Sequence, residues 1–245
     1  MALESLKKIE EALDHDEVSA YKANFEVFKG GLSRHDIAKY YDKWAETGEY
    51  DMHLNPNRYT GPESAARALA KQFSAEERST ARILDVAAGT GRLGAELYNL
   101  GFRHLDALDP SEGMLNKARE RHIYTNFIND FIGLDNPVPV EDDTYDGLAV
   151  SGGFREGHIP ATALHEMIRV VRPGMFDSYC ITNTSGVICI AMREEYLDYV
   201  SEYKGTLEPF MHNLKRNGKL KFLSKDTITD YAFGKSGVIF QFVIS

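Results

Sequence analysis

The sequence predicts an α/β fold in which helices cover both faces of a mostly parallel sheet. The first indication is the stretch 83–94, where a buried apolar strand passes through a glycine turn into a helix. The second is that short apolar runs then alternate with segments of helical periodicity, which is typical of parallel strands joined by helices. A chain of 245 residues with 43% hydrophobic content can bury one large core. One main domain is therefore expected.

Two amphipathic segments precede that domain. Apolar residues recur at helical spacing over residues 3–13 and again over 18–28, and two glycines at 30–31 end the second segment. These spacings predict two helices joined near residues 14–16. The helices either pack on the main core or form a lid over a substrate.

The elements of the main domain follow in order. Pro62 precedes apolar residues spaced four apart over 65–73, which predicts a helix before the first strand, and the glycine turn opens another helix near Arg92. The remaining apolar runs and helical stripes predict strands at 105–108, 124–128 and 145–150, and helices at 112–121 and 161–171.

The sequence closes with helical segments over 194–203 and 205–217 and then a hairpin. The runs 219–229 and 238–244 flank turn residues at 234–237, which predicts an antiparallel pair of strands. A standard dehydrogenase half would continue with parallel βα units. The hairpin therefore counts against a nicotinamide-binding domain, by analogy of fold.

The glycine turn itself fits two cofactors. Gly89 and Gly91, with Gly94, satisfy the G-x-G-x-x-G pattern of a dinucleotide site, and the helix beyond them offers unpaired N–H groups. Asp85, however, lies in a strand that a dinucleotide site usually keeps apolar. A buried carboxylate needs a cationic partner, and the ammonium group of S-adenosylmethionine would serve, directly or through water.

A second acid follows the next strand. Asp109 lies 18 residues beyond Gly91 and suits a carboxylate that accepts from ribose hydroxyls, which both cofactors require. Ser111 is predicted to cap the following helix, which turns Met114 toward Asp109, where its thioether would pack on a purine ring. These features favour S-adenosylmethionine over a nicotinamide dinucleotide.

These residues resemble those of a known family. The segments Asp-Val-Ala-Ala-Gly-Thr-Gly at 85–91 and Asp-Pro-Ser-Glu-Gly-Met-Leu at 109–115 are similar to motifs I and II of class I S-adenosylmethionine-dependent methyltransferases. With Tyr-Tyr-Asp-Lys-Trp-Ala at 40–45, Gly-His-Ile-Pro at 157–160 and Met-Arg-Glu-Glu-Tyr at 192–196, the pattern most resembles the methyltransferase-like 27 group, linked to the Williams-Beuren region. The resemblance covers roughly residues 35–244.

The resemblance implies a Rossmann-like fold with a seven-stranded, mostly parallel sheet and an antiparallel last strand. Residues 35–245 would form the methyltransferase domain and residues 1–34 an N-terminal helical cap. Relatives follow their Pro-Gly pair with a second glycine and the fifth strand, whereas this chain does not. We therefore interpret 175–185 as an insertion and 187–192 as the fifth strand. The alternative places that strand at 176–182, which moves Arg193 and Tyr196 away from the site.

The resemblance also implies a cofactor-binding set. Asp130 would accept a hydrogen bond from the adenine amino group while the Phe131 amide donates to a ring nitrogen, although Asp130 could instead simply cap a turn. Tyr41, Trp44 and Tyr59 would cover the cofactor or belong to the core. The expected cofactor-binding residues are Tyr41, Trp44, Tyr59, Asp85, Ala87, Gly89, Gly91, Asp109, Pro110, Met114, Asp130, Phe131 and Ser151.

The methyl acceptor is expected beyond the fourth strand, because open α/β sheets bind ligands at the carboxyl ends of their strands. The predicted substrate-binding residues are Tyr41, Phe154, Arg193 and Tyr196. Arg193 would pair with a substrate carboxylate or would instead bond Glu156 or Glu195 at the surface.

His158 is the predicted catalytic base, because histidine titrates near neutrality, and Glu156 competes for the same role. His158 could instead only stabilise its loop. Methyl transfer requires no obligatory triad, since positioning and exclusion of water supply most of the acceleration.

Composition narrows the class of function. A net charge of -9 argues against a protein that binds the phosphate backbone of nucleic acid. The basic residues at 215–221 form only a small group. Cys180 and Cys189 lack metal-ligand spacing, so neither a disulfide nor a metal site is expected. The chain shows no signal peptide and no apolar run near the roughly 20 residues that span a bilayer. A cytoplasmic monomer or homodimer without membrane or nucleic-acid partners is predicted.

The leading hypothesis is transfer of a methyl group from S-adenosylmethionine to a nitrogen or oxygen atom of a small-molecule acceptor, which releases S-adenosylhomocysteine. A protein side chain is the second acceptor class. A regulatory protein that binds S-adenosylmethionine without turnover is a further alternative, if the insertion at 175–185 closes the acceptor pocket. An NAD-linked oxidoreductase is disfavoured by Asp85, by the Met114 segment and by the closing hairpin.

Overall fold

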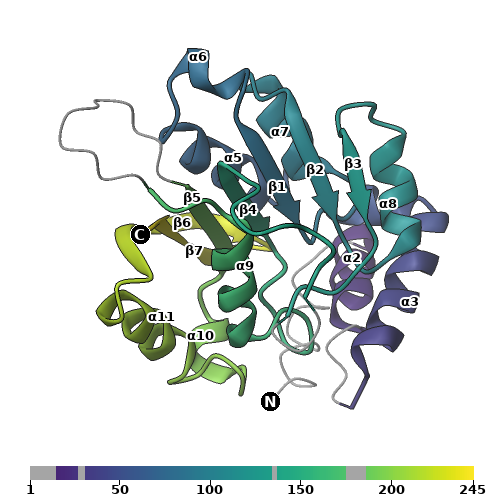
Figure 1. Ribbon diagram of the computed structural model, residues 1–245. Helices are drawn as coiled ribbons and strands as arrows, with labels where there is room; N and C mark the ends of the chain where they lie inside the picture. Colours follow the sequence, from purple (N-terminus) through teal and green to yellow (C-terminus); the bar gives the residue numbers. More distant parts are fainter. Residues whose placement is uncertain (1–14, 27–30, 134–136, 175–185) are drawn as a thin grey trace.

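The computed structural model describes residues 15–26, 31–133, 137–174 and 186–245, and its centre is a seven-stranded sheet (Figure 1). The strands lie in the order β3-β2-β1-β4-β5-β7-β6. They are β1 (Arg82–Val86), β2 (His104–Leu108), β3 (Asn126–Ile128), β4 (Gly147–Ser151), β5 (Val187–Arg193), β6 (Leu220–Ala232) and β7 (Lys235–Ile244). Strands β1 to β5 run parallel, and β7 lies antiparallel between β5 and β6. The predicted fold class is confirmed.

Helices surround the sheet. In chain order they are α2 (His15–Glu26), α3 (Arg34–Glu46), α4 (Glu49–His53), α5 (Gly61–Ala70), α6 (Ala75–Arg78), α7 (Arg92–Asn99), α8 (Glu112–Arg119), α9 (Leu164–Val170), α10 (Tyr196–Tyr199) and α11 (Leu207–Arg216). Figure 1 shows α3 and α8 beside the β3 edge, and α10 and α11 toward the opposite end of the sheet. In the part of the chain described, no helix is both long and apolar enough to cross a membrane.

Two apolar layers join the sheet to its helices. Successive side chains of a strand point to opposite faces, so Leu148 and Ala149 of β4 belong to different layers. Leu148 packs in a cluster with Leu164 of α9 and Met211 of α11. Ala149 packs in a second cluster that includes Leu69 of α5. Helices therefore cover both faces, as expected.

The structure decides between the two predicted positions of the fifth strand. Strand β5 covers Val187–Arg193, so the interpretation that placed it at 187–192 is confirmed. Residues 175–185, interpreted as an insertion, lie outside the described residues, as does the first predicted helix at 3–13.

Other predicted boundaries are less accurate. The helix expected at 18–28 corresponds to α2, which begins at His15. The helix expected at 194–203 is wrong in length, because the backbone leaves helical angles at Val200 (φ -70°, ψ 119°) and α10 ends one residue earlier. The strand expected from residue 145 begins at Gly147, since Tyr145 forms only an isolated bridge with Val171.

The N-terminal helix α2 packs against the main domain. The Tyr40 hydroxyl of α3 donates to the Ala23 carbonyl of α2 at 2.9 Å. Tyr21 of α2 lies edge-on to Phe233 of the β6–β7 hairpin, with ring centroids 5.8 Å apart. These contacts set α2 beside the carboxyl edge of the sheet, and the domain boundary at residue 34 stays a prediction.

Candidate cofactor and acceptor site

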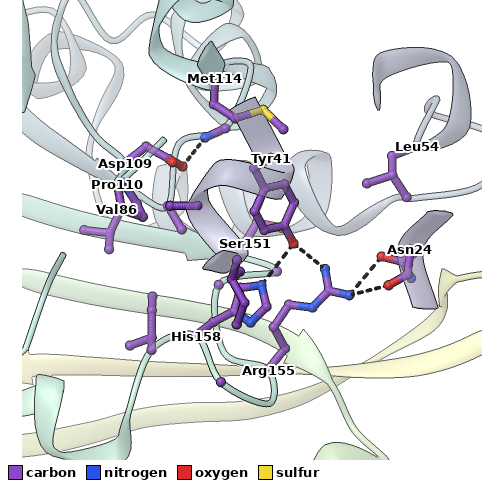
Figure 2. A pocket seen from close by; sticks show the side chains of 18 of the residues that line it. Asn24, Tyr41, Leu54, Val86, Asp109, Pro110, Met114, Ser151, Arg155 and His158 are labelled. Atoms are coloured by element: carbon purple, nitrogen blue, oxygen red, sulfur yellow. Dashed lines mark hydrogen bonds between the residues drawn. The ribbon is translucent and has the colours of Figure 1, made fainter. Parts of the chain in front are cut away.

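A cavity lies at the edge where β1, β2, β4 and β5 end, which is the ligand-binding edge of open α/β sheets (Figure 2). Its empty space, open mouth included, is about 1030 Å³. The loops after these strands line the cavity, and α2, α3 and the β6–β7 hairpin add to its walls. Residues from four strand ends, two helices and a hairpin therefore meet at one cavity.

The glycine turn after β1 brings the backbone to this cavity. Ala87 (φ +54°) and Gly89 (φ +56°) both take left-handed conformations and both line the cavity. A Cβ added at Gly89 would meet the Tyr50 hydroxyl at 3.5 Å, and Tyr50 is itself a lining residue. Glycine therefore leaves room for a ligand beside the turn. Alanine at 87 costs roughly 1–2 kcal/mol of backbone strain, which the surrounding structure must offset.

Asp109 is held at the end of β2 by two main-chain groups. The Gly89 amide donates to Oδ2 at 2.8 Å, and the Ser111 amide donates to Oδ1 at 2.9 Å. Burial raises the pKa of this carboxyl to about 6, and the nearby Asp42 adds to the effect. Each carboxylate oxygen retains capacity to accept a further hydrogen bond. Asp109 is thus oriented to bind a ligand hydroxyl in the cavity.

Helix α3 is tied to the helix that follows Asp109. The Asp42 carboxylate accepts from the Ser111 hydroxyl at 2.7 Å and from the Gly113 amide at 2.9 Å. Ser111 in turn caps α8, because its hydroxyl accepts from the Met114 amide at 3.1 Å. The predicted cap is therefore present, and it holds the buried Met114 side chain against the cavity.

Asp85 lies in β1, as the sequence indicated. Its carboxylate is fully buried beneath the glycine turn, and it accepts from the Tyr124 hydroxyl at 2.6 Å. Burial raises its pKa to about 7, opposed by Tyr124 and by the Gly94 amide of α7. Asp85 is not among the described residues that line the cavity. Its Oδ1 is buried without a hydrogen-bond partner among the described residues, so the expected contact with a ligand ammonium group, directly or through water, stays a prediction.

The other predicted cofactor residues divide into two groups. Those that line the cavity are Tyr41, Tyr59, Ala87, Gly89, Asp109, Pro110, Met114, Phe131 and Ser151. Trp44, Gly91 and Asp130 are outside that described lining, as Asp85 is. The Trp44 ring stacks behind Tyr41, with centroids 6.1 Å apart, and its indole N–H donates to His53 Nδ1 at 3.1 Å. Gly91 caps α7 with the Tyr124 ring so close that a Cβ would approach it to 2.9 Å.

Asp130 follows the alternative interpretation, in which it caps a turn. Its Oδ1 accepts from the Phe131 amide at 2.7 Å, so the amide expected to meet an adenine nitrogen is already engaged. The Phe131 ring does line the cavity, and the Arg34 guanidinium lies 4.6 Å from its centroid. Phe131 therefore contributes an apolar ring to this end of the site.

Tyr41 of α3 forms a hydrogen-bonded cluster with Arg155 and His158 of the loop beyond β4 (Figure 2). Arg155 Nη1 donates to the Tyr41 hydroxyl at 3.1 Å, and that hydroxyl lies 3.0 Å from His158 Nε2. Arg155 Nη2 also donates to the Asn24 amide oxygen at 2.9 Å. The cluster therefore joins α2, α3 and the loop after β4.

This environment keeps the tyrosine protonated and the histidine neutral. Burial raises the pKa of Tyr41 to about 12. Enclosure in the cavity, and then the positive charge of Arg155, lowers the pKa of His158 to about 3. A general base works best with a pKa near the operating pH. The pKa of His158 therefore lies well below the range that suits a general base at neutral pH.

The Glu156 carboxylate, the competing base, is not among the described residues that line the cavity. Glu156 contributes its main-chain carbonyl instead, which lies 2.7 Å from His158 Nδ1.

The predicted substrate residues also divide. Tyr41, Arg193 and Tyr196 line the cavity, whereas the Phe154 side chain is fully buried against Tyr203 with ring centroids 5.9 Å apart. Arg193 is buried, donates to Glu195 at 3.1 Å and lies 5.6 Å from the Tyr196 ring centroid. Of the pairings considered for Arg193, the structure contains the one with Glu195.

Neutral hydroxyl groups gather at the end of β4. The Tyr59 hydroxyl lies 2.7 Å from the Ser151 hydroxyl and 3.3 Å from that of Tyr231. Tyr231 donates to the Ala191 carbonyl at 3.2 Å. Burial raises the pKa of both tyrosines, so these groups remain hydrogen-bonding phenols.

The sequence did not identify several residues of the cavity as ligand-binding. These include Asn24, Tyr50, Arg155 and Tyr231. Arg155 lies directly between Phe154 and Glu156, which the sequence analysis had singled out, and this position was a usable signal. Tyr231 comes from the distant hairpin, and no local pattern marks it. Among the described residues, no group of three or more acidic, histidine or cysteine side chains could hold a metal ion.

The fold and this site define a class of protein. A parallel sheet with one reversed strand, a glycine turn beside an oriented acid and a cavity at the strand ends are those of a class I, Rossmann-like methyltransferase. A sequence model of the ubiE/COQ5 methyltransferase family matches residues 36–227. The chain belongs to that family.

Individual relatives agree with this membership. Human Methyltransferase-like protein 27 is 31% identical over 179 residues, which cover 73% of this chain and 66% of that protein. A Roseobacter denitrificans protein named ubiquinone/menaquinone biosynthesis C-methyltransferase UbiE is 35% identical over 101 residues, or 40% of each chain. The chain thus spans less than two thirds of the length of the curated relatives it matches. The resemblance stated from the sequence is confirmed.

A solved structure shows the same fold. Burkholderia thailandensis 1,6-didemethyltoxoflavin-N1-methyltransferase superposes with a TM-score of 0.54 at 18% identity, covering 85% of this chain and 87% of that chain. That crystal structure contains bound 1,6-didemethyltoxoflavin and S-adenosylhomocysteine. Membership of the methyltransferase family, rather than this likeness of fold, supports S-adenosylmethionine as the expected cofactor.

Proposed function

We propose that this chain transfers the methyl group of S-adenosylmethionine to a small organic acceptor. The observation that carries the proposal is the Asp109 carboxylate, which the Gly89 and Ser111 amides orient at the edge of the cavity. A buried carboxylate with a raised pKa gains from further donors, and a pair of ribose hydroxyls would supply them. The family membership of residues 36–227 supports the same reaction.

The residues present fit the cofactor. Asp109 would bind the ribose, and Met114 and Phe131 would enclose the purine between a thioether and an aromatic ring. Gly89 leaves the space that a Cβ would fill beside the turn. Bound S-adenosylmethionine would supply an electrophilic methyl group on a sulfonium centre. The chain's own contribution is to bind, to orient and to exclude water.

The acceptor would occupy the part of the cavity beyond β4 and β5. Tyr41, Tyr59, Tyr196 and Tyr231 line that part, which favours a compact acceptor with a flat or apolar body. The sequence indicated a nitrogen or oxygen nucleophile. A relative named as a C-methyltransferase adds an activated carbon to that range. A protein side chain remains the alternative acceptor.

Charge also favours a small acceptor over a polyanion. The whole chain has a net charge of -9, yet Arg34, Arg155 and Arg193 line the cavity beside one acid, Asp109, in its described lining. One arginine would suit the cofactor's own carboxylate and another a negative group of the acceptor. A cytoplasmic location and a monomeric or homodimeric state stay predictions.

Calorimetry tests the cofactor. Wild-type protein should bind S-adenosylmethionine and S-adenosylhomocysteine but not NADH, and Asp109→Ala should lose that binding. The control is Glu76→Ala, which removes an exposed acid of α6 that is not among the described residues lining the cavity. Binding of NADH instead of S-adenosylmethionine would overturn the proposal.

Turnover is tested separately. Release of S-adenosylhomocysteine with a pool of small metabolites, but not with a pool of unmodified proteins, supports the small-molecule acceptor. Turnover with the protein pool alone would favour the alternative. Binding of the cofactor without turnover on either pool would favour a regulatory protein.

A further inference from the structure

Both ring nitrogens of His158 form hydrogen bonds. Nδ1 lies 2.7 Å from the Glu156 carbonyl oxygen, and Nε2 lies 3.0 Å from the Tyr41 hydroxyl. A carbonyl oxygen can only accept, so Nδ1 must carry the hydrogen of this bond. In a neutral imidazole the other nitrogen then has a lone pair, so Nε2 accepts from Tyr41.

The donors and acceptors in the rest of the cluster follow from this assignment. Tyr41 gives its hydrogen to His158, so its oxygen is the acceptor for Arg155 Nη1 at 3.1 Å. Arg155 Nη2 reaches Asn24 on α2 at 2.9 Å. The hydrogen bonds therefore run in one direction from Arg155 through Tyr41 to His158 and the Glu156 carbonyl (Figure 2). Protonation of Nε2 would remove the acceptor that Tyr41 needs.

The charges that face His158 oppose a second proton. Arg155, from its own loop, and Arg34, from α3, both lower its pKa, and enclosure in the cavity lowers it further. The Tyr41 hydroxyl from α3 and the Glu156 carbonyl are the neutral groups in contact with the ring. The backbone hydrogen bond to Glu156 acts in the opposite direction but does not reverse the result.

We propose that His158 is a positioning residue that holds the Tyr41 hydroxyl and, through it, Arg155, and that it does not take a proton from the acceptor. His158 acts as a fixed hydrogen-bond acceptor at Nε2. All three residues line the cavity, and in this proposal Tyr41 and Arg155 are the groups that contact the acceptor.

The positioning role has a consequence for the acceptor, which rests on the proposed function. A site without a base at this point suits acceptors whose nucleophile is already ionised at neutral pH, such as acidic phenols, enols and carboxylic acids. The guanidinium of Arg155, bonded to the neutral groups of Tyr41 and Asn24, is compatible with such an anion. An alkylammonium acceptor would have to lose its proton elsewhere. The dependence of rate on pH would then follow the acceptor's own ionisation.

Nitrogen NMR of the ring tests the positioning role without any substrate. In protein labelled with ¹⁵N-histidine, His158 should show hydrogen on Nδ1 and a lone pair on Nε2, with shifts constant from pH 8 to about pH 5.5. Free imidazole in the same tube reports the ordinary titration. Tyr41→Phe should move the Nε2 resonance, because it removes the donor. A midpoint near pH 6.5, or hydrogen on Nε2, would overturn the proposal.

Two substitutions separate positioning from base catalysis in the active enzyme. The amide oxygen of His158→Gln can accept from Tyr41 but cannot serve as a base, whereas His158→Phe can do neither. We expect His158→Gln to keep kcat/KM within about fivefold and His158→Phe to lose at least tenfold. Loss of a general base would lower both by about 10²–10⁴-fold. Equal large losses in the two variants contradict the inference.

The control is His165→Gln, on the exposed face of α9, which should leave kcat/KM unchanged. S-adenosylhomocysteine binding, measured in each variant, distinguishes this inference from the proposed function. A protein that does not bind S-adenosylhomocysteine but keeps the neutral ring at pH 5.5 would contradict the proposed function and support the positioning of Tyr41.

Discussion

The Tyr124 hydroxyl donates to Oδ2 of Asp85 at 2.6 Å, and the pair closes the space beneath the glycine turn. Asp85 is fully buried in β1, and the Tyr124 ring lies beside Gly91 and Gly94 at the start of α7. A Cβ at Gly94 would overlap the Tyr124 hydroxyl, so glycine at that position is a packing requirement of this pair. The glycine turn after β1 therefore packs against a buried carboxylate and a phenol rather than against apolar side chains alone.

The first prediction concerns Tyr124→Phe. The substitution removes the donor to a buried carboxylate, which should lower the free energy of unfolding by about 1.5–3 kcal/mol at pH 8, where Asp85 is ionised. At pH 5.5 the carboxyl is protonated, and the loss should fall to about 0.5–1.5 kcal/mol. Urea unfolding at the two pH values measures both. Tyr98→Phe, at an exposed tyrosine, is the control; equal losses at the two pH values would contradict the role of the charge.

The second prediction is the pH dependence of Asp85 itself. Its pKa is raised from 3.8 to about 7 on folding. Its contribution to stability is therefore complete below about pH 4 and is lost as the pH rises through 7, by about 2–4 kcal/mol. Asp109, whose pKa is raised to about 6, acts in the same direction. The protein without cofactor should thus be less stable at pH 8 than at pH 5.

Asp85→Asn isolates the first of these two acids. The variant should lose the pH dependence of stability that Asp85 causes and keep the smaller one that Asp109 causes. Its free energy of unfolding should therefore exceed that of wild type near pH 8. Thermal unfolding across pH 5–8 measures the two slopes. Parallel curves for variant and wild type would show that Asp85 does not titrate in this range.

The parts of the fold that could be predicted are those with local patterns. The apolar run ending at Asp85, the glycines at 89 and 91 and the acid at 109 are close in sequence, and each predicts a strand, a turn or a site on its own. The partner of Asp85 could not be predicted, because Tyr124 lies 39 residues away and its hydroxyl meets the carboxylate only in the folded chain. A buried acid indicated that a partner exists but not which one.

The same reason limited the prediction of the site. The Arg155 guanidinium reaches Asn24, 131 residues earlier, and no periodicity connects the two positions. His158 lines the cavity beyond β4, and its role toward an acceptor stays a prediction. Its protonation state could not be predicted from the sequence, because its pKa depends on enclosure and on Arg155, which are properties of the folded loop.

The third prediction concerns the contact between α3 and α8. A Cβ at Gly113 would lie 2.8 Å from the Asp42 Cα atom and 2.9 Å from its carbonyl oxygen, and these backbone atoms have little room to move. Gly113→Ala should therefore lower the free energy of unfolding by about 1–3 kcal/mol. It should also weaken S-adenosylhomocysteine binding, because Asp42 directly follows the cavity residue Tyr41 in α3. Asn116→Ala, exposed on the same helix, is the control; an unchanged stability in Gly113→Ala would show that the two helices can separate freely.

The last prediction concerns Arg193 and the acidic neighbour that it contacts. Arg193 is buried at the end of β5, lines the cavity and bonds Glu195 at 3.1 Å, so Glu195 and an anionic acceptor would compete for one guanidinium. Arg193→Gln should raise the KM of an anionic acceptor by about 10–100-fold, the value of a hydrogen bond to a charged group, with cofactor affinity unchanged. Glu195→Gln should act in the opposite direction and lower that KM, because it removes the competing carboxylate while the arginine remains. Steady-state kinetics with the acceptor identified by S-adenosylhomocysteine release measures both. If both variants raise the KM equally, the ion pair is a structural unit and Arg193 does not bind the acceptor; only opposite shifts identify the arginine as its partner.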